Sequence, residues 1–280
     1  MKKITRRSFL AAAGLSVAAL ALTACGGSSS STASSVASSA AASSEAASSS
    51  AAAAELTTVE AGKLTMATNA TFPPYEMTTD TGAFEGIDID TAQAIADKLG
   101  LELQVDDMDF DAALLSVQQG KADIVMAGVT VTDERKAVMD FSDSYATGIQ
   151  SIIVPEGSDI ASPDDLAGKK IGTQRGTTGY IYCSDDFGDS NVVAYDNGLT
   201  AVQALNNGQV DAVVIDNAPA QEFVAANPGL KVLDTSYAEE DYAIGMAKGS
   251  ALEDAVNKAL EELKADGTLQ AIVDKYINAN

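Results

Sequence analysis

The chain has 280 residues, 46% of them hydrophobic, and a formal net charge of −23. So strong a negative charge repels the phosphates of nucleic acids and anionic lipid surfaces, so we expect no nucleic acid partner. The sequence has no histidine, which excludes a Ser/His/Asp triad, a Cys/His pair and a histidine-based zinc site; we expect no catalytic residue, cofactor or metal.

The first 24 residues have the layout of an export signal. Four basic residues precede an apolar run from Phe9 to Leu22, which is too short to cross a bilayer comfortably. The paired arginines also resemble a twin-arginine signal, and an ordinary Sec signal stays open as the alternative. The sequence Leu22-Thr23-Ala24-Cys25-Gly26 resembles the lipobox of bacterial lipoproteins, whose cysteine is lipidated. We therefore expect residues 1–24 to be a signal peptide and Cys25 to carry lipid; the alternative is a plain signal peptide with a chance cysteine.

Residues 25–55 are expected to form the lipidated N-terminus and a flexible tether. The stretch from Gly26 to about Ala54 is almost entirely serine and alanine, with too little apolar surface to offset the entropy of ordering. Without residues 1–24 and their four basic side chains, the net charge is −27, so a bound anion needs a cation placed beside it. If Cys25 is lipidated, Cys183 has no disulfide partner, and we expect a buried structural thiol there.

From Leu64 onward, strand and helix patterns alternate. The first half predicts a strand at 64–68, a helix at 88–99, a strand at 101–105, a helix at 111–119 and strands at 123–126 and 149–154. The second half predicts a capped helix near 162–165, strands at 170–173, 191–195, 212–215 and 242–247, a helix after Thr178, and helices at 199–207, 217–226, 251–265 and 269–278. Strand-helix-strand order with short connections predicts parallel strands.

The two halves share a pattern. Residues 114–125 and 201–213 each read as a helix, a glycine stop, one or two polar residues and an Asp-led buried strand. The repetition indicates two similar α/β lobes, and a cleft between lobes is a common place for a small ligand. The alternative is that this unit is simply a frequent α/β building block.

A series of motifs, in order and with family-like spacing, adds a specific resemblance. The series is Asn69-Ala70-Thr71-Phe72-Pro73-Pro74-Tyr75-Glu76, Gly86-Ile87-Asp88-Ile89-Asp90, Met108-Asp109-Phe110, the stretch from Ala127 to Lys136, Asp140-Phe141-Ser142, the stretch from Gly168 to Gly172, and Arg175-Gly176-Thr177-Thr178-Gly179. From about Leu64 to the C-terminus, the chain resembles the polar amino acid-binding proteins of ABC importers, which have the type II periplasmic-binding-protein fold.

The resemblance implies an α/β fold of two lobes, each a mostly parallel sheet flanked by helices. It implies that residues 60–147 and 242–280 form lobe 1, and that residues 148–241 form lobe 2. Two crossing segments, near 146–150 and 240–245, are expected to act as a hinge.

The resemblance also implies a site for the head group of an amino acid. A buried zwitterion needs both charges paired, and arginine can bind a carboxylate with two parallel hydrogen bonds. Arg135 matches the family's carboxylate arginine, Asp216 matches the acid for the α-ammonium, and Gly128, Thr130 and Thr178 match further head-group contacts. The local alternatives are a solvated helix-end charge for Arg135, a cap of the next helix for Asp216, and a simple helix-start turn at Thr178.

Around the ligand's side chain, the resemblance implies aromatic walls and a few polar positions. Phe72 and Phe110 match the walls, with core packing as their alternative role. Asn69, Gln174 and Gly179 are expected to set selectivity. The family members that we associate with basic amino acids tend to carry an acid near Asn69, so the neutral amide favours an uncharged polar ligand.

The resemblance thus implies that this protein is the extracytoplasmic substrate-binding component of an amino acid importer. We expect it to capture a free polar amino acid by hinge closure and to deliver it to an ABC permease with its ATPase. We also expect it to act as a monomer and to be anchored to the cell membrane through its N-terminal lipid only. Two alternatives remain: a cyclohexadienyl dehydratase-like enzyme on the same fold, and a ligand-binding receptor for a signalling partner.

Overall fold

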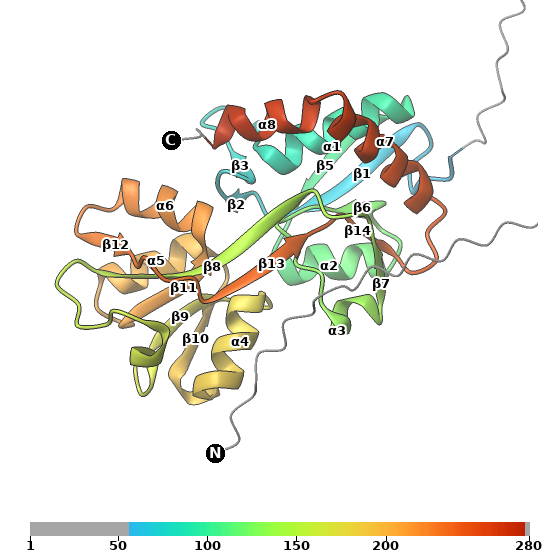
Figure 1. Ribbon diagram of the computed structural model, residues 1–280. Coiled ribbons are helices and arrows are strands. Elements are labelled where there is room, and N and C mark those ends of the chain that lie inside the picture. The colour runs from blue at the N-terminus through green and yellow to red at the C-terminus, as the bar shows by residue number, and fades with distance from the viewer. Residues whose placement is uncertain (1–55, 278–280) are drawn as a thin grey trace, which may run out of the picture. The chain divides into compact units, whose positions relative to one another are not determined.

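The computed structural model describes residues 56–277 (Figure 1). The predicted signal peptide, the lipidated Cys25 and the tether all lie outside these described residues. Within residues 56–277, no helix combines the length and the hydrophobicity that a membrane span requires.

The first lobe is built on a five-stranded sheet in the order β5-β1-β6-β14-β7. Its strands are β1 (Lys63–Thr68), β5 (Glu102–Asp107), β6 (Ile124–Val125), β7 (Met139–Phe141) and β14 (Gly245–Ala247). Strand β1 is parallel to β5 and β6. The connections between these successive strands contain the helices α1 (Ile87–Leu99) and α2 (Phe110–Gln118), which carry the chain back to the end of the sheet where the preceding strand began. Strand β14 comes from much later in the chain and runs antiparallel to β6 and β7.

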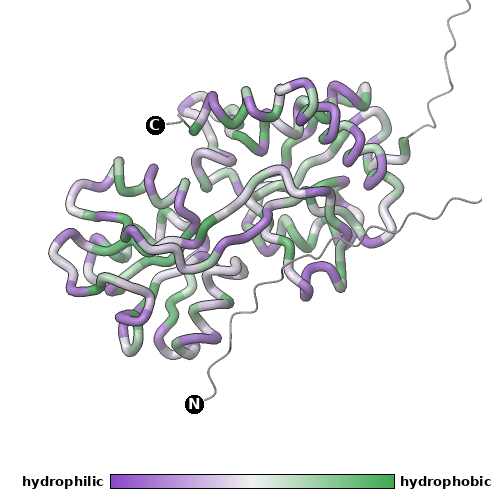
Figure 2. The backbone as a smooth tube through the Cα atoms, viewed as in Figure 1, coloured by the Kyte–Doolittle hydropathy of each residue, from purple (hydrophilic) through white to green (hydrophobic). Residues whose placement is uncertain are grey.

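Helices cover both faces of this sheet. Helices α1, α7 (Glu253–Ala265) and α8 (Thr268–Tyr276) contact one another on one face, and α2 packs on the other (Figure 1). Side chains of β1 alternate accordingly: Leu64 and Met66 join the core under α1 and α7, and Ala67 joins the core under α2. In Figure 2, hydrophobic and hydrophilic residues alternate along these helices, as expected for helices with one buried face.

The second lobe is built on a sheet in the order β10-β9-β11-β8-β12, with β13 paired to β8. Its strands are β8 (Ala146–Pro155), β9 (Ile171–Gln174), β10 (Val192–Tyr195), β11 (Ala212–Asp216), β12 (Leu230–Val232) and β13 (Ala238–Tyr242). Strand β9 is parallel to β10 and β11, whereas β8 is antiparallel to β11, β12 and β13.

The helices of the second lobe also divide between two faces. Val213 and Ile215 point toward α5 (Gly198–Asn206) and α6 (Asn217–Ala226). Ala212 and Val214 belong to the opposite core, which contains Cys183 of α4 (Thr178–Phe187). Cys183 is buried without a disulfide, and burial raises the pKa of its thiol to about 12. The thiol is therefore protonated and inert at neutral pH.

Two long strands connect the lobes. In the antiparallel pair of β8 and β13, residues 146–150 lie opposite residues 238–242, and Thr147 pairs with Asp241 (Figure 1). The predicted crossings near 146–150 and 240–245 fall on this ladder and just beyond its end. The exact lobe boundaries, at 147/148 and 241/242, stay a prediction.

The structure adds three features to the predicted elements. The helix-linked strands are parallel as expected, but the strands that enter from the connections run antiparallel, so both sheets are mixed. The expected run 242–247 is divided, because β13 ends at Tyr242 in the ladder and β14 begins at Gly245 in the other sheet. A small sheet of β2 (Thr71–Phe72), β3 (Glu76–Thr78) and β4 (Phe84–Glu85) precedes α1. Three short helical turns complete the fold: α3 (Asp133–Lys136) and the 3-10 helices Pro163–Leu166 and Asp189–Asn191.

Candidate ligand-binding site

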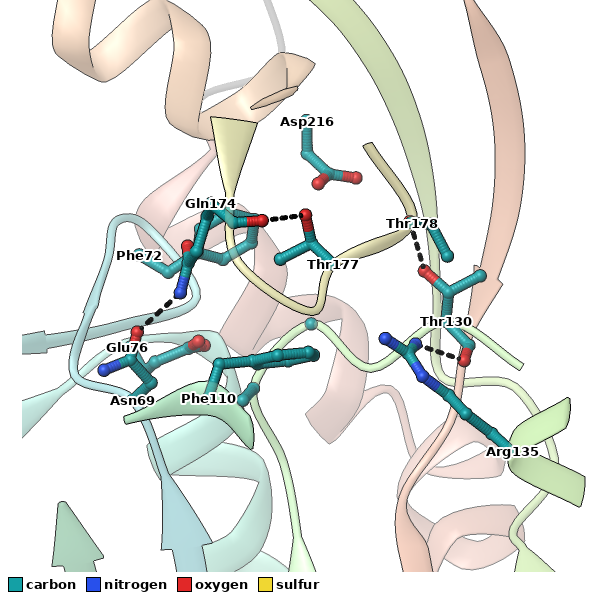
Figure 3. A pocket seen from close by; sticks show the side chains of 12 residues that line it. Asn69, Phe72, Glu76, Phe110, Thr130, Arg135, Gln174, Thr177, Thr178 and Asp216 are labelled. Carbon is teal, nitrogen blue, oxygen red and sulfur yellow. Dashed lines mark hydrogen bonds between the residues drawn. The ribbon is translucent and has the colours of Figure 1, made fainter. Parts of the chain in front are cut away.

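A cavity lies between the two lobes, lined by residues of both (Figure 3). The lining residues are Asn69, Phe72, Glu76, Phe110, Ala127, Gly128, Thr130, Arg135, Gln174, Thr177, Thr178 and Asp216. All the predicted site residues are among them except Gly179, which is buried in the first turn of α4. A Cβ added to Gly179 would lie 2.8 Å from Gln150 Oε1, so the nearest side chain is that of Gln150 on β8.

Polar contacts join the lobes around the cavity. Gln174 Nε2 donates to Asn69 Oδ1 at 2.9 Å, and Arg135 Nη2 donates to the Gly176 carbonyl at 3.2 Å. The hydroxyls of Thr130 and Thr178 lie 3.4 Å apart. The structure therefore has the closed arrangement, in which residues of both lobes contact across the cleft.

Arg135 faces this cavity from the short helix α3. Its side chain is buried, with the residue only 8% exposed; Nη1 donates to the Thr130 carbonyl at 2.7 Å, and the guanidinium lies 5.3 Å from the centre of the Phe110 ring. Desolvation lowers its pKa, but an arginine stays charged at neutral pH. Residues 56–277 contain one other arginine, Arg175, whose side chain is 57% exposed. The geometry does not fit the solvated helix-end charge that local sequence also allowed.

Asp216 ends β11 at the position where it could cap α6, but its side chain makes no capping hydrogen bond. The carboxylate instead accepts from the Tyr242 hydroxyl and from Gln150 Nε2, the latter at 2.8 Å. Burial raises the pKa of Asp216 to about 7, and these two hydrogen bonds act against that rise. A buried carboxylate on the cavity wall is a site that favours a cation.

Two adjacent threonines at the start of α4 have different roles. The Thr177 hydroxyl caps the helix by accepting from the backbone N–H of Tyr180 at 3.4 Å. The Thr178 hydroxyl donates to Glu240 Oε2 at 3.0 Å, and the same oxygen accepts from Gln150 Nε2 at 2.9 Å. Gln150 and Glu240, on the two connecting strands, thus link Thr178 to Asp216. Sequence reasoning did not single them out, because neither belongs to a motif.

The walls of the cavity include two rings and a glycine. Phe72 comes from β2 and Phe110 from the start of α2, and both are buried in the cores of the first lobe, so packing and lining are roles they share. Gly128 has φ 55°, and a Cβ there would lie 2.8 Å from Phe72 Cε1. Glycine is therefore required for the backbone to pass this close to the ring.

Glu76 is a lining residue that sequence analysis left without a role. It begins β3 and is 1% exposed, and among the described residues no N–H or O–H group donates to either of its carboxylate oxygens. Beside it lies Asp88 of α1, fully buried, which accepts from the Tyr145 hydroxyl at 2.7 Å and from the Gly128 N–H at 3.0 Å. Burial raises the pKa of Glu76 well above its usual range and that of Asp88 to about 6.

Buried charge around the cavity is unbalanced. In residues 56–277, the buried acids are Glu76, Asp88, Asp123, Asp216 and Glu240, and the one buried base is Arg135. Asp123 lies apart, accepting from the backbone N–H groups of Val59 and Thr65. The other four acids line the cavity or contact residues that do, so the site favours a ligand with more positive than negative charge. The described residues contain no cluster of side chains suited to a metal ion.

Comparison with known proteins places this architecture in a family. The model for bacterial extracellular solute-binding proteins, family 3, matches residues 64–279. The L-cystine-binding protein TcyJ of Escherichia coli (strain K12) is 34% identical over 226 residues, which cover 79% of this chain and 85% of TcyJ.

Solved structures give the same result. The arginine-, lysine-, histidine-binding protein ArtJ of Geobacillus stearothermophilus matches with a TM-score of 0.75 and 34% identity, over 78% of this chain and 96% of ArtJ. An ancestral arginine-binding protein bound to arginine matches with a TM-score of 0.74 and 44% identity, over 78% of this chain and 99% of that chain. The family match and these likenesses agree with the two-lobed fold and the cavity between the lobes: the chain belongs to the bacterial extracellular solute-binding proteins of family 3.

Proposed function

We propose that this protein, as the substrate-binding component of an amino acid ABC importer, binds the head group of a free amino acid between Arg135 and Asp216. The observation that carries the proposal is the placement of these two buried, opposite charges on one cavity between the lobes. The Arg135 guanidinium would bind the α-carboxylate with two parallel hydrogen bonds. Asp216, held by Tyr242 and Gln150, would accept from the α-ammonium.

The remaining head-group contacts come from groups already oriented by the fold. Thr130 and Thr178 present hydroxyls on the cavity wall, and the first turn of α4 directs backbone N–H groups that favour an anion. Gly128 keeps the backbone close to Phe72, and the rings of Phe72 and Phe110 would enclose the ligand's side chain.

Beyond the rings, the side-chain end of the pocket contains Asn69, Gln174 and Glu76. The neutral Asn69 alone favoured an uncharged ligand, but Glu76 adds a buried carboxylate without a donor among residues 56–277. A buried acid of this kind is best satisfied by a guanidinium or an ammonium group. We therefore propose a cationic amino acid, such as arginine or lysine, as the preferred ligand. Arginine is also what the names of several relatives specify.

We propose the rest of the transport cycle as follows. Ligand contacts to both lobes favour the closed form, and closure presents a surface that the ABC permease with its ATPase can distinguish. The protein would act as a monomer on the extracytoplasmic face, without catalysis, anchored to the cell membrane only through lipid on Cys25. The relatives reported above are binding proteins, which favours this function over a dehydratase on the same fold.

A thermal-shift panel of the twenty amino acids tests the proposal. A ligand that binds only the folded protein, at a hundred times its dissociation constant, adds about 2.7 kcal/mol to stability, which raises the midpoint by several degrees. Arginine or lysine should give the largest shift. A flat panel on folded, ligand-free protein would refute amino acid binding and make prephenate and arogenate the next ligands to test. Closure is tested separately by small-angle scattering, since an unchanged radius of gyration at saturation would exclude it.

A further inference from the structure

We infer that, in the protein without ligand, the buried carboxyl group of Glu76 holds a proton, and that the cationic side chain of the ligand displaces this proton when it binds. The inference rests on the proposed function, because it concerns the side-chain end of the same cavity. Its consequence is that capture of a cationic amino acid releases a proton that capture of a neutral amino acid of the same shape does not release.

The surroundings of Glu76 require a proton on its carboxyl group. Glu76 is 1% exposed, and an ionised carboxylate buried without a donor or a counter-charge would carry an uncompensated charge. The Asp88 oxygens already accept from Tyr145 and from Gly128. Glu76 has no donor among the described residues. The proton therefore belongs on Glu76 and not on Asp88, and the stronger rise in the pKa of Glu76 agrees with this assignment.

No basic group of the described residues faces Glu76 or its neighbour Asp88. From the surrounding elements, the titratable groups that act on Glu76 are acids: Asp88 of α1, Asp216 of β11 and Asp107 of β5. The nearby tyrosines, Tyr75 and Tyr145, are themselves buried, and their pKa values lie above the usual range. Arg135 donates instead to the carbonyls of Thr130 and Gly176. The folded chain thus supplies the Glu76–Asp88 pair with no counter-charge of its own.

A ligand cation changes this balance. A guanidinium or ammonium within a few ångströms of Glu76 favours the ionised carboxylate, so it lowers the pKa of Glu76 and expels the proton to solvent. The sign follows from linkage: because binding releases a proton, the affinity for a cationic ligand rises with pH, by up to tenfold per pH unit for one proton. Asp216 also loses a proton when it pairs with the α-ammonium, but that release is common to all amino acids.

Arginine and citrulline separate the two releases, since citrulline has nearly the same shape but a neutral side chain. Titration calorimetry of the purified full chain, in buffers of different ionisation enthalpy at pH 6, 7 and 8, counts the protons released by each ligand. Competition against arginine extends the measurement to weak citrulline binding. We expect arginine to release up to about one proton more than citrulline, and the ratio of the two affinities to rise with pH.

Two variants test whether Glu76 is the source of the extra proton that arginine releases. Glu76→Gln keeps the shape but cannot release a proton, so the excess release for arginine should disappear and arginine affinity should fall at least tenfold. Glu85→Gln is the matched control: it removes an exposed glutamate from the same small sheet and should leave the excess unchanged.

Equal proton release for arginine and citrulline, or an excess that survives in Glu76→Gln, would overturn the inference while leaving amino acid binding intact. Binding of citrulline but not of arginine would overturn it as well. Failure of every amino acid to bind the folded protein would instead refute the proposed function itself.

Discussion

Replacing Arg135 by methionine is the sharpest perturbation of the proposed head-group site. The variant keeps most of the buried volume but removes the one buried base of residues 56–277. A ligand α-carboxylate would then enter the cavity without its partner. Breaking a buried ion pair by removing one side costs about 3–5 kcal/mol. At about 1.4 kcal/mol per factor of ten, ligand affinity should fall by roughly 140- to 4,000-fold.

Isothermal titration calorimetry with the best ligand of the amino acid panel measures this loss. Arg135→Lys restores the charge but not the planar fork, and should recover only part of the affinity. Arg175→Met is the control, because Arg175 is 57% exposed and pairs with Asp196 at 3.6 Å; it should change affinity by less than about twofold. A folded Arg135→Met protein that binds within threefold of the wild type would refute the head-group assignment.

Three further predictions concern Asp216 and one glycine. Asp216→Asn should lower ligand affinity at least about 30-fold in the same calorimetric assay, because the α-ammonium loses a charged partner; an unchanged affinity would exclude Asp216 from the site. The pKa of Asp216, about 7, is raised above its unfolded value of about 3.9, so the folded protein binds more protons than the unfolded chain between these limits. Stability of the ligand-free protein should therefore fall as pH rises from about 4 to about 7, by at most about 1.4 kcal/mol per pH unit from this group; urea unfolding should show a smaller fall in Asp216→Asn. Gly86→Ala should cost about 2–5 kcal/mol in urea unfolding, because φ is 133° and the Cβ would lie 2.1 Å from the Tyr75 carbonyl oxygen, whereas Gly82→Ala, at φ 80° in open space, should cost only about 1 kcal/mol; equal costs would contradict the steric explanation.

Most helices and strands could be predicted from the sequence because their signals are local. The sequence predicts a helix at 88–99, and α1 forms at Ile87–Leu99. Its apolar residues recur at helical spacing along one face, and Gly100 marks its end. The division of 242–247 into two strands could not be predicted in this way. Apolar character is continuous across Tyr242 and Gly245, and only the positions of two different sheets decide that the chain changes partner between them.

Site residues could be predicted from the sequence where the family resemblance identifies their positions. Residues whose role depends on burial in the folded protein were harder to predict. Arg135 and Asp216 belong to positions that the family resemblance identified, and the fold brings both to one cavity. Glu76 belongs to one of the motifs, but the motif alone assigns it no role. Its significance arises only when the β2–β3 hairpin buries it beside Asp88, a residue of the following helix. Local sequence carries no signal that two acids will share one buried space.

The Glu240–Gln150 link illustrates the same limit. These residues are 90 positions apart in the chain, and they meet because β8 and β13 pair between the lobes. The ligand contact of Gly179 stays a prediction: the residue lies in the first turn of α4, where an added Cβ would lie 2.8 Å from Gln150 Oε1.

A crystal structure of the protein with bound arginine tests the proposed site directly. We expect the ligand in the cavity between the lobes, with its carboxylate within hydrogen-bonding distance of the Arg135 guanidinium, its ammonium on Asp216 and its guanidinium on Glu76. Arginine bound in the opposite orientation, or density for the ligand outside this cavity, would contradict it.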